Sequence, residues 1–124
     1  MLYLIVFLGA GIGGALRHGV NVGAARLFGY GFPFGTLIVN VAGCLIIGLL
    51  AGLIMSERLA LRFYWREFLF VGILGGFTTF STFGLDTITL ARTHSLAAAL
   101  WNVMAHVVIG LLAVQVGLFF GSRQ

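Results

Sequence analysis

The sequence predicts an all-α integral membrane protein that crosses the bilayer four times, and three observations lead to that prediction. Of its 124 residues, 60% are hydrophobic and only 8% are charged, whereas the apolar fraction of a soluble domain stays near one half. The mean hydropathy is +1.13. Each spanning helix needs about 20 apolar residues, so four helices with short connections use the whole chain as a single membrane domain.

Apolar runs place the four spans at about 2–22, 34–55, 68–90 and 96–120. A turn-rich stretch with the only proline, Pro33, separates the first two spans. Every span also carries two glycines four residues apart. Such pairs leave a flat helix face that lets neighbouring backbones approach closely in lipid. The pairs are Gly9/Gly13, Gly48/Gly52, Gly72/Gly76 and Gly117/Gly121.

The positive charge comes entirely from arginines, and the formal net charge is +4. In a soluble protein this would suggest nucleic acid as a partner. Here the arginines lie at span ends and in connections, which is a topology signal, so we expect a lipid bilayer and no nucleic acid. With four crossings, four arginines lie on one side and two or three on the other. This weak bias permits insertion in both orientations and therefore an antiparallel, dual-topology dimer.

The third span contains a segment unlike an ordinary spanning helix, GGFTTFSTFG at 75–84. Its paired glycines and four hydroxyl residues within five positions weaken helix formation. We therefore predict a helix break near 75–79, which is tolerated in a membrane only when buried in protein or lining a wet cavity. Carbonyls freed at such a break can coordinate a small cation. The alternative is that the hydroxyls bond carbonyls three or four residues back and only bend the helix.

Hydrogen-bond donors and aromatic rings near this segment suit the passage of an anion. Ser81, Thr82 and Asn40 can all donate hydrogen bonds, and the ring edges of Phe80 and Phe83 are positive. Plain packing is the alternative for the two rings, and from spacing alone it is the stronger one. For Asn40 the alternative is a role as a polar bond between helices.

Three further polar residues lie within the spans. Arg17 is costly inside a bilayer, so it points into the bundle or reaches the interface. Asp86 is the only carboxylate within a predicted span, and it is a candidate for pairing or gating. We expect His106 to be packed or hydrogen-bonded. No group of His, Cys and carboxylate residues has metal-ligand spacing, and no nucleophile–base pattern occurs, so enzyme function has little support.

Three segments together resemble the Fluc/CrcB family of fluoride channels. They are GGALR at 13–17, GTLIVN at 35–40 and GGFTTFSTF at 75–83. The third is highly specific, and the resemblance covers nearly the whole chain. It implies a fluoride-selective channel of the plasma (inner) membrane. Such a channel passively exports cytoplasmic fluoride, which re-enters cells as HF.

The resemblance also implies an assembly and its site residues. The assembly is an antiparallel homodimer with two fluoride pores and a structural sodium ion at the dimer centre. Backbone carbonyls at the third-span break, by position those of Gly75 and Thr78, would hold the sodium ion. The residues implied for the ring-lined pores and their polar track are Phe80, Phe83, Asn40, Ser81 and Thr82.

Several departures from the family pattern leave alternatives open. Family members often carry Ser or Thr on the fourth helix, where this chain has Gly110 and Val114, and Asp86 replaces a common glutamate. Some members work as pairs of non-identical chains, so this chain is alternatively a non-conducting subunit of a heterodimer. A small multidrug-resistance-type, proton-coupled exporter is another alternative. It needs a membrane-embedded carboxylate, usually in the first helix, whereas the first acidic residue here is Glu57 in a connection.

Overall fold

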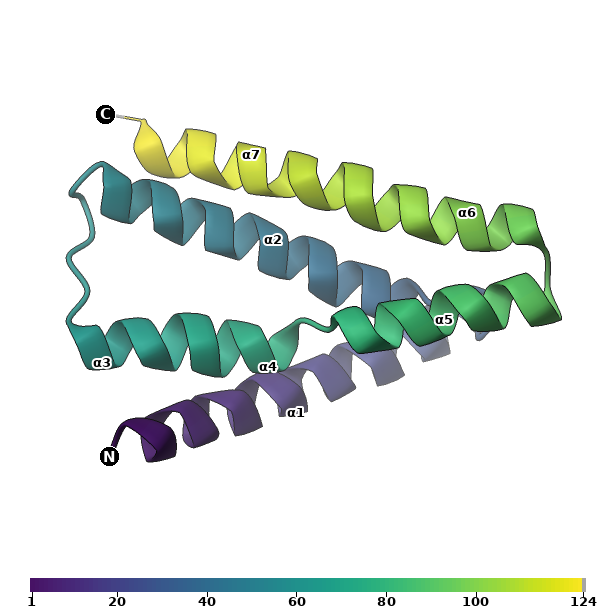
Figure 1. Ribbon diagram of the computed structural model, residues 1–124, viewed down its shortest axis with the longest axis horizontal. Coiled ribbons are helices and arrows are strands. Elements are labelled where there is room, and N and C mark those ends of the chain that lie inside the picture. The colour runs from purple at the N-terminus through teal and green to yellow at the C-terminus, as the bar shows by residue number, and fades with distance from the viewer. Residues whose placement is uncertain (124) are drawn as a thin grey trace.

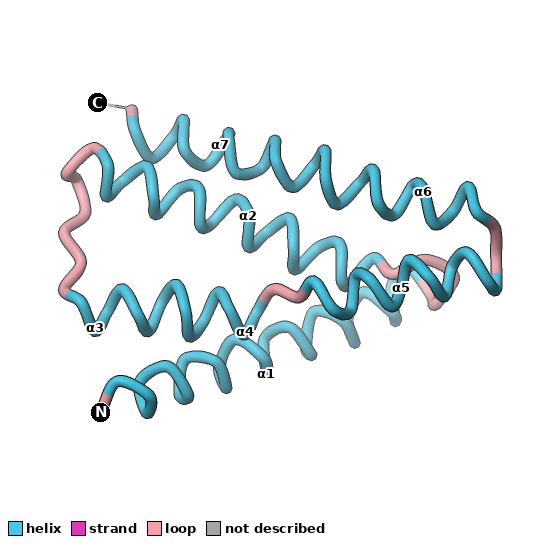
Figure 2. The backbone as a smooth tube through the Cα atoms, in the orientation of Figure 1, coloured by secondary structure: helices cyan, strands magenta, loops and turns pink. Residues whose placement is uncertain are grey.

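Helices account for all regular structure in the computed structural model, which describes residues 1–123 (Figures 1 and 2). Four helical stretches are long and apolar enough to cross a membrane, so the chain is a multi-pass membrane protein. The first two are α1 (Leu2–Phe28) and α2 (Phe34–Met55). The third comprises α3 (Phe63–Arg66), η1 (Glu67–Leu74), α4 (Gly75–Phe77) and α5 (Phe80–Thr93). The fourth comprises α6 (Leu96–Met104), η2 (Ala105–Ile109) and α7 (Gly110–Ser122).

Both chain ends and the connection between α2 and α3 lie at the same end of the bundle (Figure 1). The connections from α1 to α2 and from α5 to α6 lie at the opposite end. This is the arrangement that four crossings require, and it groups the arginines as the sequence predicts. Gly29 closes α1 with a positive φ of 77°, a conformation that glycine adopts at little cost.

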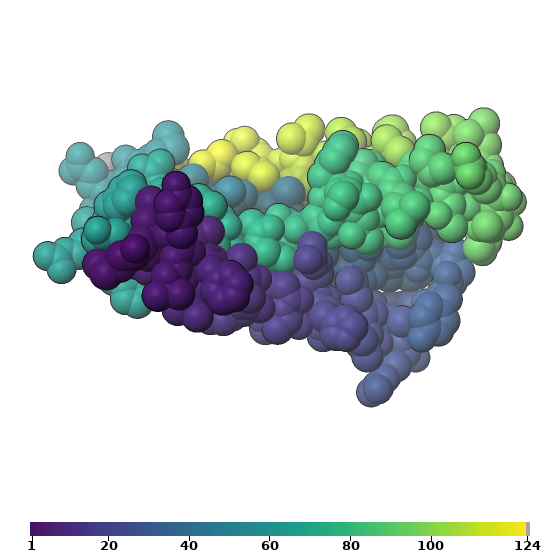
Figure 3. Space-filling model, turned by 60° about the horizontal axis from the view of Figure 1, so that its bottom comes forward, coloured from purple at the N-terminus to yellow at the C-terminus, as the bar shows by residue number. Residues whose placement is uncertain are grey.

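The bundle consists of two closely packed helix pairs. The second span lies along α7, and α1 lies along η1 and α4. Figure 3 shows α1 exposed along one face of the molecule, with the third span beside it. The pair formed by α5 and α6 joins the third span to the fourth through a short turn at 94–95.

The glycine pairs lie where these helices touch, which confirms that they serve tight packing within the chain. A Cβ atom added to Gly9 would lie 2.9 Å from the Cα of Gly72, and one added to Gly52 would lie 2.9 Å from the Cα of Gly121. Real Cβ atoms essentially never approach so closely. The pair in α1 thus packs on the pair in η1 and α4, and the pair in α2 packs on the pair in α7.

The helix break in the third span is narrower than the range of 75–79 that the sequence suggests. Gly75–Phe77 remain helical as α4, and only Thr78 and Thr79 have extended backbone. Back-bonding, the alternative interpretation, also occurs, because the Thr78 hydroxyl donates to the Leu74 carbonyl at 2.9 Å. The glycines therefore do not break the helix themselves.

Three helical stretches extend beyond the predicted spans. The first helix continues to Phe28, the third stretch runs from Phe63 to Thr93, and the fourth ends at Ser122. The additional turns carry arginines and aromatic residues typical of the membrane interface. Hydropathy marks the apolar core of a span, whereas backbone hydrogen bonding continues into the interface.

Candidate functional site

Asn40 on α2 binds both backbone groups of Thr79 at the helix break. Its side-chain nitrogen donates to the Thr79 carbonyl at 2.9 Å, and its side-chain oxygen accepts from the Thr79 N–H at 2.8 Å. A buried backbone without helical partners needs such bonds. Asn40 thus forms a polar bond between α2 and the start of α5, which is one of the two roles that the sequence suggested for it. One side-chain N–H remains, because a primary amide carries two donors.

Two carbonyls next to the break lose their usual helical partners. The N–H four residues after Gly75 belongs to Thr79, and it is taken by Asn40. The N–H four residues after Thr78 belongs to Thr82, and it donates to the Thr79 hydroxyl at 3.2 Å. The Thr78 carbonyl instead accepts from Arg17 Nη1 at 3.4 Å. Arg17 therefore points into the bundle, as one of its two predicted placements required.

Neutral carbonyl oxygens of this kind are suitable ligands for a small hard cation. Gly75 is exposed, and a Cβ added there would meet only the Phe70 carbonyl, at 3.7 Å. The Gly75 carbonyl therefore fits the role that the family resemblance implies for it, whereas the Thr78 carbonyl is already shared with Arg17. Among the described residues, no group of three or more His, Cys, Asp or Glu side chains is placed to hold a metal ion.

A cluster of hydroxyls follows the break at the start of α5. The Thr79 side chain caps the helix, and its hydroxyl lies 3.0 Å from that of Thr82 and 3.4 Å from that of Ser81. The N-terminal end of a helix has free N–H groups and the positive end of the helix dipole. This half-helix therefore presents a favourable environment for an anion in the middle of the bundle.

The two predicted pore rings lie in one groove, which we call the Phe groove. It has a volume of about 510 Å³. The rings of Phe80 and Phe83 have centroids 5.4 Å apart. No carboxylate contributes to the lining of this groove. The lining residues are Asn40, Gly43, Cys44, Ile47, Phe70, Leu74, Gly75, Thr78, Thr79, Phe80, Phe83, His106 and Val107.

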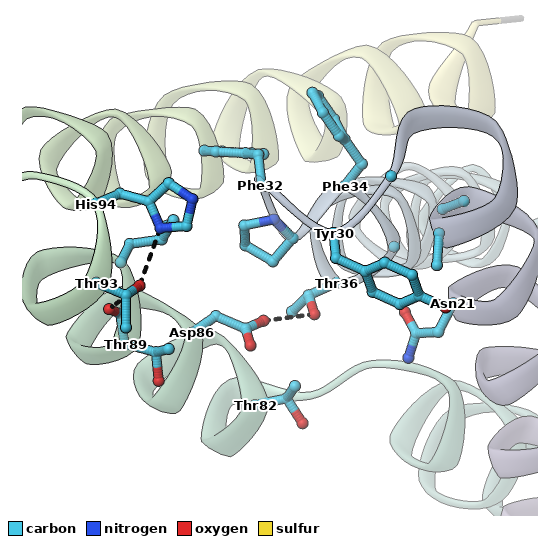
Figure 4. A pocket seen from close by; sticks show the side chains of 17 residues that line it. Asn21, Tyr30, Phe32, Phe34, Thr36, Thr82, Asp86, Thr89, Thr93 and His94 are labelled. Carbon is cyan, nitrogen blue, oxygen red and sulfur yellow. Dashed lines mark hydrogen bonds between the residues drawn. The ribbon is translucent and has the colours of Figure 1, made fainter.

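A second recess, the polar pocket, opens toward the connection between α1 and α2 and has a volume of about 360 Å³ (Figure 4). Asp86 points across it toward Thr36, whose hydroxyl donates to the carboxylate at 2.7 Å. Thr82 lies beside them in the same recess. The pairing predicted for Asp86 is thus observed, with a hydroxyl as its partner. Its lining side chains with polar groups are Asn21, Tyr30, Thr36, Thr82, Asp86, Thr89, Thr93 and His94.

Hydrogen bonds connect the linings of the two recesses. Asn40 and Thr79 line the Phe groove, and Thr82 lines the polar pocket. The bonds from Asn40 to Thr79 and from Thr79 to Thr82 form one continuous polar path. Asn40 and the two phenylalanines therefore line one groove, and Thr82 joins them through Thr79 from the neighbouring pocket. Ser81 lies beside the path but lines neither recess.

The fourth span contributes to the groove through residues that the sequence did not single out for this role. Gly110 and Val114, the family's hydroxyl positions, line neither recess, and Gly110 is buried. His106 and Val107 line the groove instead. His106 bonds to the Asn102 carbonyl at 2.9 Å and packs on Phe83, which confirms that it is packed and hydrogen-bonded.

Three residues at or near the site were missed by sequence reasoning. Thr79 was counted among hydroxyls but not recognised as the capping residue that Asn40 binds. Thr87 and Asn102 form a hydrogen bond of 2.9 Å between α5 and α6. An asparagine inside an apolar span was the available signal for Asn102, because such residues often bond neighbouring helices.

Comparison with known proteins agrees with this arrangement. Residues 4–118 match the family model described as CrcB-like protein, Camphor Resistance (CrcB). The chain is 53% identical to the fluoride-specific ion channel FluC of Methylobacterium nodulans, over 90% of this chain and 88% of that protein. It is 50% identical to the protein of the same name from Paracoccus denitrificans, over 96% of this chain and 93% of that protein. It is 47% identical to the fluoride-specific ion channel FluC of Chloroflexus aurantiacus, over 95% of this chain and 93% of that protein. The chain therefore belongs to the CrcB family, as its three sequence segments predicted.

Proposed function

We propose that this chain forms a fluoride channel that passively exports cytoplasmic fluoride across the plasma (inner) membrane. The observation that carries the proposal is the polar path of Asn40, Thr79 and Thr82, which links the polar pocket to the Phe groove. Relatives that are about half identical over most of their length carry the name fluoride-specific ion channel, and this supports the same substrate here.

The chemistry of the path favours a small anion over a cation. Its side chains offer amide and hydroxyl donors, and the positive end of α5 lies beside it. In the Phe groove, where the lining has fewer hydroxyl donors, the positive ring edges of Phe80 and Phe83 would contact the anion instead. A larger, less strongly hydrogen-bonding anion gains less from such donors, so fluoride is favoured over chloride.

An antiparallel homodimer completes the site in this proposal. The Phe80 side chain is 82% exposed in the single chain, although it belongs to the groove that is proposed to conduct. A second copy would cover this ring and close the groove into a pore. The weak arginine bias between the two ends of the bundle supports insertion in both orientations.

A structural sodium ion at the dimer centre is part of the same proposal. The carbonyls of Gly75 and Thr78 would hold it, and two chains would supply four such oxygens. When bound, the ion supplies positive charge that offsets the carbonyl dipoles at the negative end of α4. Asn40 keeps the Gly75 carbonyl without its helical donor, because it occupies the Thr79 N–H, and the Thr79 hydroxyl does the same for the Thr78 carbonyl by accepting from the Thr82 N–H. At the Thr78 carbonyl the ion would take the place of Arg17.

The alternatives differ in what they require of the chain. A proton-coupled exporter needs a membrane-embedded carboxylate, usually in the first helix, and α1 contains none. A heterodimer is favoured by a specific observation, since Gly110 and Val114 leave the outer half of the polar track without the fourth-helix hydroxyls that family members often carry. In that case a sister chain would supply the missing donors.

Fluoride efflux from liposomes, followed with a fluoride electrode, tests the proposal. Purified protein alone should release fluoride well above the rate of empty liposomes. Release only after a sister chain is added would favour the heterodimer. No release in either case would overturn the channel proposal.

A further inference from the structure

Two buried polar atoms without a hydrogen-bond partner lie close to the Phe groove. Across residues 1–123 they are the only buried side-chain nitrogen or oxygen atoms in this state, and they are Oδ1 of Asn102 and Nε2 of His106. Asn102 has an exposed fraction of 0%. A fully buried amide inside a membrane helix carries a cost, so its position requires an explanation. The path of conduction gives none, because Asn102 lines neither the Phe groove nor the polar pocket.

One arm of contacts runs from the Asn102 side chain to the backbone of Phe83. The amide nitrogen donates to the Thr87 hydroxyl at 2.9 Å, and that hydroxyl donates to the Phe83 carbonyl at 2.8 Å. A threonine that bonds the carbonyl four residues back is common in helices. Here the same hydroxyl also accepts a bond from another helix, so α6 is tied to the turn of α5 that begins at Phe83.

A second arm runs from the Asn102 main chain to the ring of Phe83. The Asn102 carbonyl lies 2.9 Å from Nδ1 of His106. Because a carbonyl can only accept, Nδ1 carries the hydrogen. The imidazole then lies against Phe83, with ring centroids 4.4 Å apart and an interplanar angle of 43°. The wider helical turn of η2 contains His106, and such turns occur frequently at functional sites.

We propose that the Asn102 side chain positions Phe83 by acting on its backbone through Thr87, while the Asn102 main chain holds His106 against the Phe83 ring. This inference rests on the proposed function, because Phe83 matters only if its ring lines the pore. The two arms close a loop from Asn102 to Phe83 and back. The loop sets how far the ring edge reaches into the groove, and thereby the rate and selectivity of fluoride passage.

Variants of the first arm test the proposal in the full-length protein. Asn102→Leu removes the amide at similar volume, and Thr87→Val removes the shared hydroxyl at similar shape. Each should lower fluoride efflux per reconstituted protein by about tenfold, because sites whose supporting contacts are lost become too loose to act. The double variant should be no slower than either single variant, since both changes cut the same arm. Thr87→Ser keeps the hydroxyl, so its fluoride efflux should stay within about twofold of that of the unaltered protein.

Two further measurements separate positioning from stability and from the proposed function itself. Ser122→Ala serves as the control, because it removes an exposed hydroxyl-to-carbonyl bond far from Phe83 and should leave efflux unchanged. A 4-fluorophenylalanine label at position 83 reports the ring environment by fluorine NMR without any need for conduction. Thr87→Val should shift or broaden that resonance, even if Asn102→Leu fails to fold.

Unchanged efflux and an unchanged resonance in folded Thr87→Val would overturn the positioning role, and so would rate losses that multiply in the double variant. If the unaltered protein passes no fluoride, either alone or with a sister chain, the proposed function fails. The NMR shift then still decides whether Asn102 and Thr87 position the ring.

Discussion

Replacing Asn40 with leucine should both destabilise the protein and stop fluoride passage. The substitution keeps a similar volume but removes the two bonds to Thr79, at 2.9 Å and 2.8 Å. Thr79 is only 8% exposed, so water cannot replace the lost partner. The Thr79 N–H left without a partner costs about 1–3 kcal/mol, whereas the Thr79 carbonyl, at the N-cap of α5, still accepts the first bond of the helix. Hydrogen bonds between membrane helices contribute on average only about 0.6 kcal/mol each to stability. Because Asn40 makes two of them, its loss should lower the free energy of unfolding by at least about 1 kcal/mol.

The assay measures the free energy of unfolding in detergent and fluoride efflux from liposomes on the same preparation. Thr36→Val is the comparison for unfolding, because it removes one side-chain bond from the same helix, to the Asp86 carboxylate, and should cost about 1.5–3 kcal/mol. We expect efflux of Asn40→Leu to fall to the rate of empty liposomes. An unfolding free energy and an efflux rate both equal to those of the unaltered protein would refute the reasoning.

Further predictions concern packing, the cation and the orientation. Gly9→Ala should lower the unfolding free energy by about 1–3 kcal/mol through overpacking, whereas Gly11→Ala, with no atom within 4 Å of the added Cβ, should raise it by up to about 1 kcal/mol. Sodium should raise the Tm relative to choline, and Thr78→Val should keep that increase, because the proposed ligand is a backbone carbonyl. In a Cys44→Ser background, Ser122→Cys should react with an impermeant maleimide at about half of the molecules in intact cells if both orientations occur; labelling of all or none would exclude dual topology.

The span count and the break in the third span could be predicted because they depend on local signals. Apolar runs mark helices, and paired glycines mark close helix contacts. The dense hydroxyl segment marked the break in the third span. These signals act within a few turns of one helix, so one sequence is enough to find them.

The remaining features depend on contacts between distant parts of the chain. The break lies at Thr78–Thr79 because Asn40, 39 residues away, supplies the bonds that the helix gives up. Asn102 reaches Thr87 only because the short turn at 94–95 folds α6 back onto α5. His106 takes its place beside Phe83 through the same fold. No periodicity in the sequence encodes these partners.

The most direct test of the central claim is the relative flux of fluoride and chloride through the purified chain. Liposomes are loaded with both salts, and two ion-selective electrodes measure the fluoride and the chloride that appear outside. Efflux starts when a cation ionophore is added, which prevents a membrane potential from building up. The polar path and the Phe groove predict rapid fluoride release while chloride stays inside. Equal release of both anions, or release of neither, would contradict the account.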